Sequence, residues 1–156
     1  MLAVFDTYTI VKFFHVLLAI IAVGFNASYG IWVGRAAKEP EHELHVLRGI
    51  KFLDDRIANP AYGVILLLGL WMVRLGHYKL FDTFWLYTAL GMYIVVALTA
   101  ALVYTPTLKK QISILEAGRR ATPEYARVER RAQIVGPLLG VFVIGIVFLM
   151  VTKPTI

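Results

Sequence analysis

Cysteine does not occur among the 156 residues of the chain. Its absence excludes disulfide bonds, a catalytic thiolate, iron-sulfur clusters and cysteine-ligated zinc, so a bound metal would need His, Met or oxygen ligands. Charged residues are also scarce, at 17% of the chain, whereas 59% of the residues are apolar or aromatic. A water-soluble domain of this length could not cover so much apolar surface, and the composition therefore predicts an integral membrane protein.

Several catalytic patterns are missing as well. The chain contains no Ser, His and carboxylate set at a matched membrane depth and no glycine-rich phosphate loop after a strand, which leaves hydrolytic and nucleotide-driven chemistry without residues to perform it. The two imidazoles of the segment Glu41-His42-Glu43-Leu44-His45 are three residues apart and do not have the spacing of the H-E-x-x-H zinc motif. We interpret this segment as a solvated polar surface.

Long runs without Asp, Glu, Lys or Arg are the main feature that is present. There are four, at residues 13–34, 57–73, 83–108 and 132–152. A helix needs roughly 17 to 25 residues to cross a bilayer, and each run is long enough. The first run is too long for a secretory signal and lacks a cleavage pattern, so we expect it to be retained. We predict an all-α integral membrane four-helix bundle, with residues 1–156 as a single transmembrane domain and spans at about 10–34, 59–76, 83–108 and 131–152.

The segments between the spans carry further helix signals. Apolar residues at intervals of three and four predict an amphipathic cytoplasmic helix between the first two spans, on the inner leaflet or against the bundle: Leu44, Leu47, Ile50, Leu53 and Ile57. Asn59 followed by Pro60 predicts the N-cap and first position of the second spanning helix.

The third span is followed by a similar set of signals. We expect this helix to continue past Pro106 to Glu116 and to turn at Ala117 and Gly118. Thr122 and Pro123 then predict the start of the last helix, which would begin before it enters the membrane.

The distribution of positive charge predicts the orientation. Residues 35–56 and 109–131 contain 12 of the 16 Lys and Arg residues, so the positive-inside rule places these two connections in the cytoplasm and both chain termini outside. We expect a multi-pass protein of the bacterial inner (plasma) membrane. The net charge of +6 is better matched to the anionic lipid leaflet than to nucleic acid, and no nucleic-acid partner is expected. The lipid bilayer is the expected partner, and faces of small residues would also allow a homodimer or a larger membrane complex.

Polar and small residues share one face of the first span: His15, Ala19, Ala22, Asn26 and Tyr29. Because lipid cannot hydrogen-bond such groups, this face is expected to point into the bundle. His15 then becomes an inward ionisable group that could ligate a metal, relay a proton or simply hydrogen-bond a neighbouring helix.

A second histidine, His77, follows the second span on the same side of the membrane as His15. Two imidazoles near one membrane surface are suited to a b-type haem, with Arg74 and Lys79 near its propionates. The candidate cofactor-binding residues are therefore His15, His77, Asn26 and Arg74, and the candidate metal ligands are His15 and His77. The alternative for His77 is a solvated loop histidine beside interfacial aromatic residues.

The chain also resembles a group of small bacterial four-span proteins. The matching segments are Lys12-Phe13-Phe14-His15-Val16 with Gly24 and Arg35, Asn59-Pro60-Ala61-Tyr62-Gly63 through Gly69-Leu70-Trp71, Trp85-Leu86, and Val151-Thr152-Lys153-Pro154. The group includes the HemJ-type protoporphyrinogen oxidases, the copper-resistance D membrane domain and, as the nearest match, an uncharacterised family of predicted integral membrane proteins.

The HemJ resemblance implies haem binding at His15, and the copper-resistance resemblance implies copper handling in which Met72 could supply a soft ligand. The HemJ-type proteins tend to have a Lys and a His in the third span, and residues 83–108 contain neither. We therefore expect a binding protein more than an enzyme and, if an enzyme, a membrane oxidoreductase. Haem b is the leading cofactor, copper is the alternative, and a cofactor-free accessory protein or a small-solute transporter remain the competing interpretations.

Overall fold

The computed structural model describes residues 6–154, in which every regular element is a helix. The elements are α1 (Thr7–Ala36), α2 (Pro40–Leu53), the π-helix η1 (Asp54–Ala58), α3 (Asn59–Leu75), α4 (Phe84–Thr99), the π-helix η2 (Ala100–Tyr104), α5 (Thr105–Glu116) and α6 (Pro123–Thr152). Four helices among these residues are long and apolar enough to cross a membrane. The predicted all-α membrane fold is confirmed.

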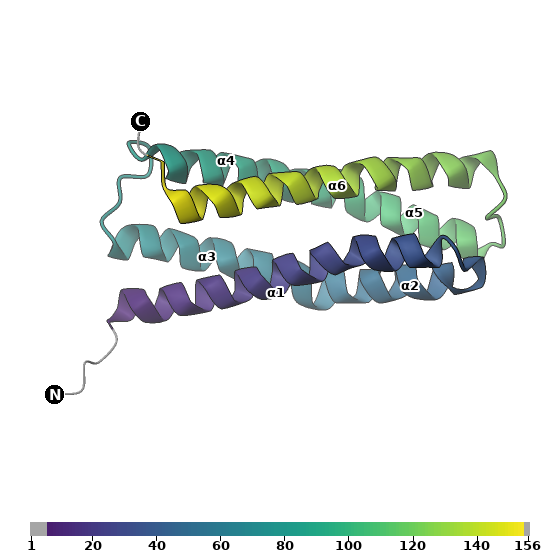
Figure 1. The fold of residues 1–156 in the computed structure, drawn as a ribbon, viewed down its shortest axis with the longest axis horizontal. Helices are drawn as coiled ribbons and strands as arrows, with labels where there is room; N and C mark the ends of the chain where they lie inside the picture. Colours follow the sequence, from purple (N-terminus) through teal and green to yellow (C-terminus); the bar gives the residue numbers. More distant parts are fainter. Residues whose placement is uncertain (1–5, 155–156) are drawn as a thin grey trace.

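The chain forms two long helical hairpins that lie side by side (Figure 1). In the first, α1 pairs with the continuous rod of α2, η1 and α3; in the second, the rod of α4, η2 and α5 pairs with α6. We call the end with the α1–α2 and α5–α6 connections the basic end. The opposite end, where α1 begins, α6 finishes and α3 connects to α4, is the terminal end.

The helix ends at the basic end follow the sequence signals. The helix that includes α5 extends to Glu116, as expected, and Gly118 adopts the left-handed conformation (φ +67°) that the turn requires. The hydroxyl of Thr122 accepts a hydrogen bond from the backbone N–H of Tyr125 at 3.3 Å, which confirms the predicted cap of α6.

The predicted N-cap at Asn59 is wrong, although α3 does begin at this residue. Asn59 has helical dihedral angles and caps nothing, because η1 joins α2 to α3 without a break. A proline inside a helix lacks an N–H and its ring clashes with the carbonyl four residues earlier, and a wider π turn can accommodate both effects. The same arrangement recurs where η2 precedes Thr105 and Pro106, so each rod passes its proline through a π segment.

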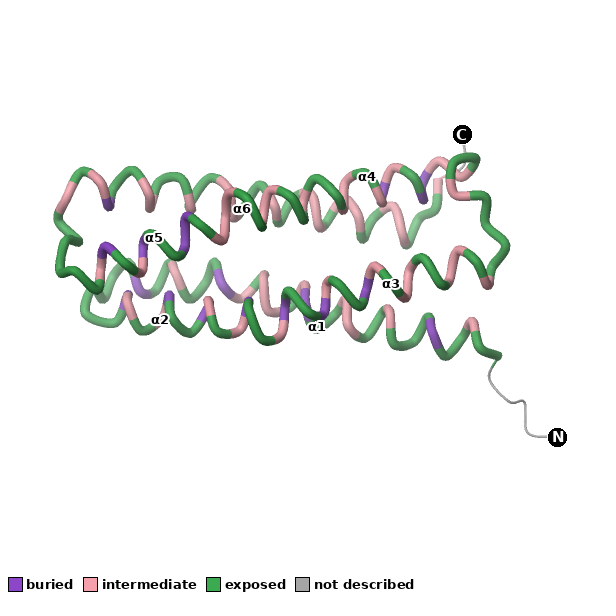
Figure 2. Tube along the Cα trace, turned by 180° about the vertical axis from the view of Figure 1, so that it is seen from behind, coloured by how far each residue is buried: buried purple, intermediate pink, exposed green. Residues whose placement is uncertain are grey.

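The most deeply buried part of the bundle lies toward the basic end, where α2 packs on both α1 and α5 (Figure 2). Tyr29, Leu47, Ile50 and Leu108 form a buried apolar cluster there. The sequence predicts an amphipathic helix either on the inner leaflet or against the bundle. In the structure this helix, α2, lies against the bundle and buries its apolar face in this cluster.

The terminal half of the bundle is packed differently. There α1 packs mainly on α3, and α4 packs mainly on α6, while the backbones of α3 and α4 do not pack directly on each other. The two hairpins are thus joined tightly at the basic end and separated toward the terminal end, and this separation leaves room for a cavity.

A candidate cofactor cavity at the terminal end

A cavity of about 400 Å³ lies between the two hairpins, with walls from α1, α3, α4 and α6. Small-molecule sites in proteins usually enclose roughly 300 to 1,000 Å³, and this cavity falls within that range. Its walls are largely aliphatic and include Val16, Ile65, Leu86, Val143 and Ile146. The cavity can therefore accept an apolar molecule, whose orientation would depend on the few polar groups in the wall.

His15 is the one histidine among the residues that line the cavity. Its Nδ1 lies 2.9 Å from the backbone carbonyl oxygen of Ile65 in α3, so the ring donates its Nδ1–H to that oxygen. This bond fixes the tautomer and leaves Nε2 as the nitrogen with a free lone pair. Metal-ligating histidines commonly have such a partner, since it orients the ring and raises its basicity.

The contact between His15 and α3 depends on Gly69. A Cβ atom added at Gly69 would lie 3.2 Å from Cε1 of His15, closer than side chains normally approach. A glycine at this position therefore lets the imidazole lie directly against the α3 backbone.

Three polar side chains continue from the cavity toward the basic end. Tyr93 of α4 donates its hydroxyl hydrogen to the backbone carbonyl of Tyr62 at 2.8 Å, and both tyrosines line the cavity. The side-chain amide of Asn26 donates to the Tyr62 hydroxyl at 2.8 Å and to the carbonyl of Ala22 at 2.9 Å. Asn26 therefore lies beyond the cavity wall and positions Tyr62, which does belong to the wall.

His77 and Arg74 do not line the cavity, and both are exposed. His77 has a φ of +52° and follows Gly76 at the C-terminus of α3, where the N–H of Tyr78 bonds to the carbonyl of Val73. His77 thus occupies the left-handed position that closes a helix. Of the four cofactor-binding residues predicted from the sequence, His15 lies in the cavity wall, whereas Asn26, Arg74 and His77 do not.

Two wall residues supply soft sulfur atoms. Met72 of α3, already noted in the sequence, and Met150 of α6 both line the cavity with His15. Sequence reasoning missed Met150 and Tyr93 because no local pattern shows which helices lie opposite α1. Among residues 6–154 no group of three or more His, Asp or Glu side chains is placed to hold a metal ion, so a metal here would rely on His15 and these thioethers.

Comparison with known families adds one finding. Residues 9–154 match the family described as "Predicted integral membrane protein (DUF2269)". The chain belongs to this family. No curated protein and no solved structure matches the chain.

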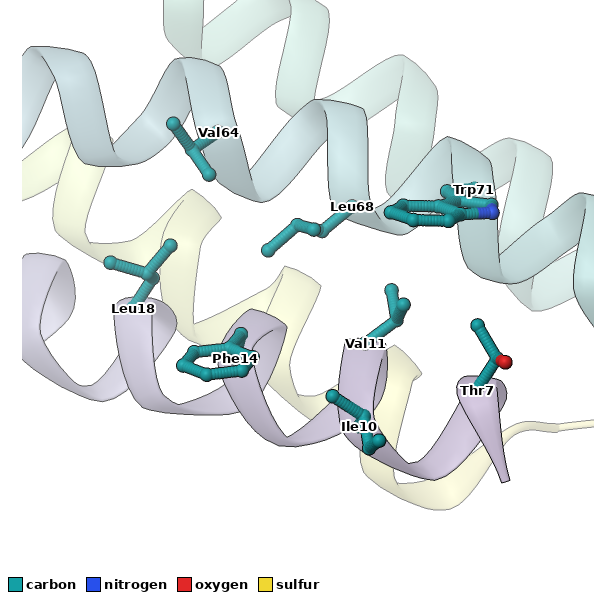
Figure 3. Close-up of a pocket in the computed structure, with 8 residues that line it drawn as sticks. All are labelled: Thr7, Ile10, Val11, Phe14, Leu18, Val64, Leu68 and Trp71. Carbon is teal, nitrogen blue, oxygen red and sulfur yellow. The ribbon is translucent and has the colours of Figure 1, made fainter. Parts of the chain in front are cut away.

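A second hollow, of about 440 Å³, lies along the outer surface between α1 and α3 (Figure 3). Its walls are apolar except for the hydroxyl of Thr7 and the indole nitrogen of Trp71, and they include Phe14, Leu18 and Val64. No ionisable side chain lines it. This groove can accommodate lipid chains, but it offers no ligand for a cofactor.

Proposed function

We propose that the protein binds haem b in the cavity between the two hairpins, where His15 would ligate the iron. The observation that carries this proposal is an apolar cavity of about 400 Å³ whose single imidazole is held by a backbone carbonyl. Apolar walls favour a porphyrin ring, and haem iron in membrane proteins is commonly ligated by histidine. The resemblance of the His15 segment to the HemJ-type proteins is consistent with this assignment.

The residues of the chain have distinct roles in this proposal. Ile65 and Gly69 would hold the imidazole of His15, and the aliphatic wall would exclude water. Met72 lies in the same wall, and its thioether would be a second candidate ligand of the iron. His77, the second ligand expected from the sequence, would have to turn inward from its exposed position. When bound, haem b supplies one-electron redox chemistry.

Copper is the second candidate ligand, because the thioethers of Met72 and Met150 share the cavity with His15. Thioether and imidazole donors suit Cu(I), which is softer than the divalent metals. A cofactor-free accessory role is the third candidate, and it would assign the cavity to lipid alone.

We further propose that the basic end faces the cytoplasm of a bacterial cell and that both termini lie outside. This orientation follows from the 12 basic residues in residues 35–56 and 109–131, the segments that contain the two connections at that end, and it would put His15 nearer the outer surface. A homodimer or a larger membrane complex is consistent with the exposed apolar face of α6, which includes Val141 and Ile144.

The test is the reduced-minus-oxidised absorption spectrum of the detergent-purified protein after haem has been supplied. We expect a b-type spectrum that is lost in His15→Ala and retained in His45→Ala, a matched control at an exposed position of α2. Loss in His77→Ala would identify His77 as the second ligand, and loss in Met72→Leu would identify Met72. A colourless wild-type protein would overturn the proposal, and bound copper without porphyrin would establish the second candidate instead.

A further inference from the structure

Three arginines share one face of α6, immediately before its uncharged run begins. Arg127, Arg130 and Arg131 are all exposed, and we call them the arginine cluster. Residues three and four positions apart are neighbours on a helix surface, with Cβ atoms about 5 to 6 Å apart. Tyr125 is 2% exposed and marks the opposite face of α6, which packs into the bundle. The three guanidinium groups therefore point away from the bundle and can reach the same ligand.

No ion pair joins the arginine cluster to an acid among residues 6–154. The two acids of α6 have other partners: Glu124 pairs with Lys110 and Arg119, and Glu129 accepts a hydrogen bond from Gln133. Like charges at these helical spacings repel one another. An anion from outside the chain would remove this repulsion.

The same face of α6 continues as an exposed apolar stripe. Ile134, Leu138 and Val141 follow Arg131 at intervals of three, four and three residues, and they are 50 to 66% exposed. From Ala132 to Thr152 the helix contains no charged residue. The arginine cluster thus lies where α6 enters the apolar part of the membrane, and the stripe lies below it.

This arrangement matches a molecule with an anionic head and apolar tails. We propose that the arginine cluster binds the phosphate of an anionic phospholipid whose acyl chains lie along Ile134, Leu138 and Val141. A guanidinium group donates paired hydrogen bonds whose geometry fits phosphate oxygens. A zwitterionic phospholipid has the same phosphate, but its ammonium group would lie beside three cations that no acid neutralises. The charge therefore selects an anionic headgroup.

The test is the binding of dioleoylphosphatidylglycerol to the detergent-purified protein, in competition with dioleoylphosphatidylcholine and measured by native mass spectrometry. The wild-type protein should retain the anionic lipid preferentially. Changing all three arginines together, as Arg127→Gln, Arg130→Gln and Arg131→Gln, should weaken its binding by about tenfold or more and abolish the preference. Neither result depends on a cofactor in the cavity.

The matched control removes the same charge from other elements: Arg35→Gln, Lys38→Gln and Arg56→Gln together. These residues are also exposed, and they lie in α1, in the α1–α2 connection and in η1. The control should keep the preference. An equal loss in both triple variants would mean that total charge attracts the lipid, and this result would overturn the proposal.

Two further measurements keep the proposal open to contradiction. Should the triple variant of the arginine cluster fail to fold, Arg127→Gln with Arg131→Gln should still reduce the preference, and an unchanged preference would contradict the assignment. Inorganic phosphate lacks acyl chains and should not displace the bound phosphatidylglycerol. Complete displacement would show a site for free phosphate instead of a lipid site.

Discussion

Nε of Arg120 lies 2.6 Å from a carboxylate oxygen of Glu43, although the two residues are 77 positions apart in the chain. The other carboxylate oxygen accepts a hydrogen bond from the hydroxyl of Tyr125. Glu43 is buried in α2, Arg120 lies in the α5–α6 connection and Tyr125 is in the first turn of α6. The hydrogen bond to Glu43, together with its negative charge, raises the pKa of the Arg120 guanidinium, and one acid thus ties the two hairpins together at the basic end.

Glu43→Gln should destabilise the protein by about 1 to 3 kcal/mol, because it removes the charge from two buried or partly buried hydrogen bonds. The measurement is denaturant-induced unfolding in detergent, followed by tryptophan fluorescence. Glu41→Gln is the control, since Glu41 is exposed on the same helix and should have almost no effect. Equal stability of both variants would show that the contact between the hairpins does not depend on this acid.

Gly69→Ala should displace the imidazole of His15, because the added methyl group would lie 3.2 Å from Cε1. Gly63→Ala is the matched control on the same helix, with no atom within 4 Å of its added Cβ. Alanine is a better helix former than glycine by up to about 1 kcal/mol, so Gly63→Ala should keep or raise the stability. The free energy of unfolding of Gly69→Ala should be lower than that of Gly63→Ala by about 1 kcal/mol or more. Gly69→Ala should also weaken ligand binding in the cavity. Identical melting and binding curves would contradict the close contact.

Acid should loosen the α5–α6 connection. The hydrogen bond and charge of Lys110, together with Arg119, hold the pKa of Glu124 below its ordinary value. Because the pKa of Glu124 is lower in the folded state than in the unfolded state, these contacts stabilise the fold fully above the ordinary pKa of glutamate. The stabilisation is lost as the pH falls through the lowered pKa, below about pH 4. A nitroxide attached to a cysteine at the exposed Ala121 should report increased mobility in that range. In Glu124→Gln, which lacks the titrating carboxylate, the same label should be mobile already at neutral pH. As the control result, its mobility should not change with pH.

The absence of cysteine makes the orientation directly testable. The variants Lys38→Cys and Lys79→Cys would each introduce a single cysteine at an exposed position, and the two positions lie at opposite ends of the bundle. In intact cells an impermeant maleimide should label the cysteine at Lys79 and leave the one at Lys38 unlabelled until the membrane is opened. The reverse pattern would invert the proposed topology.

The sequence by itself determined the features that depend on local chemistry and on the membrane. Uncharged runs of bilayer length require helices, because an apolar medium leaves backbone groups no other hydrogen-bond partners. The cap at Thr122 and the turn at Gly118 follow from single side chains and single dihedral angles. The inward position of His15 followed from the spacing of its polar neighbours along one helix.

The tertiary structure decided which groups meet. Whether Asn59 and Pro60 begin a helix or continue one depended on the packing of α2 against α1 and α5, which favours a continuous rod over a break. The pairing of His15 with Ile65 and of Glu43 with Arg120 joins residues far apart in the chain. The rotation and separation of four helices set these contacts, and periodicity along one helix cannot specify what lies opposite it. Packing likewise left His77 exposed at the end of α3 and placed Met150 in the cavity wall.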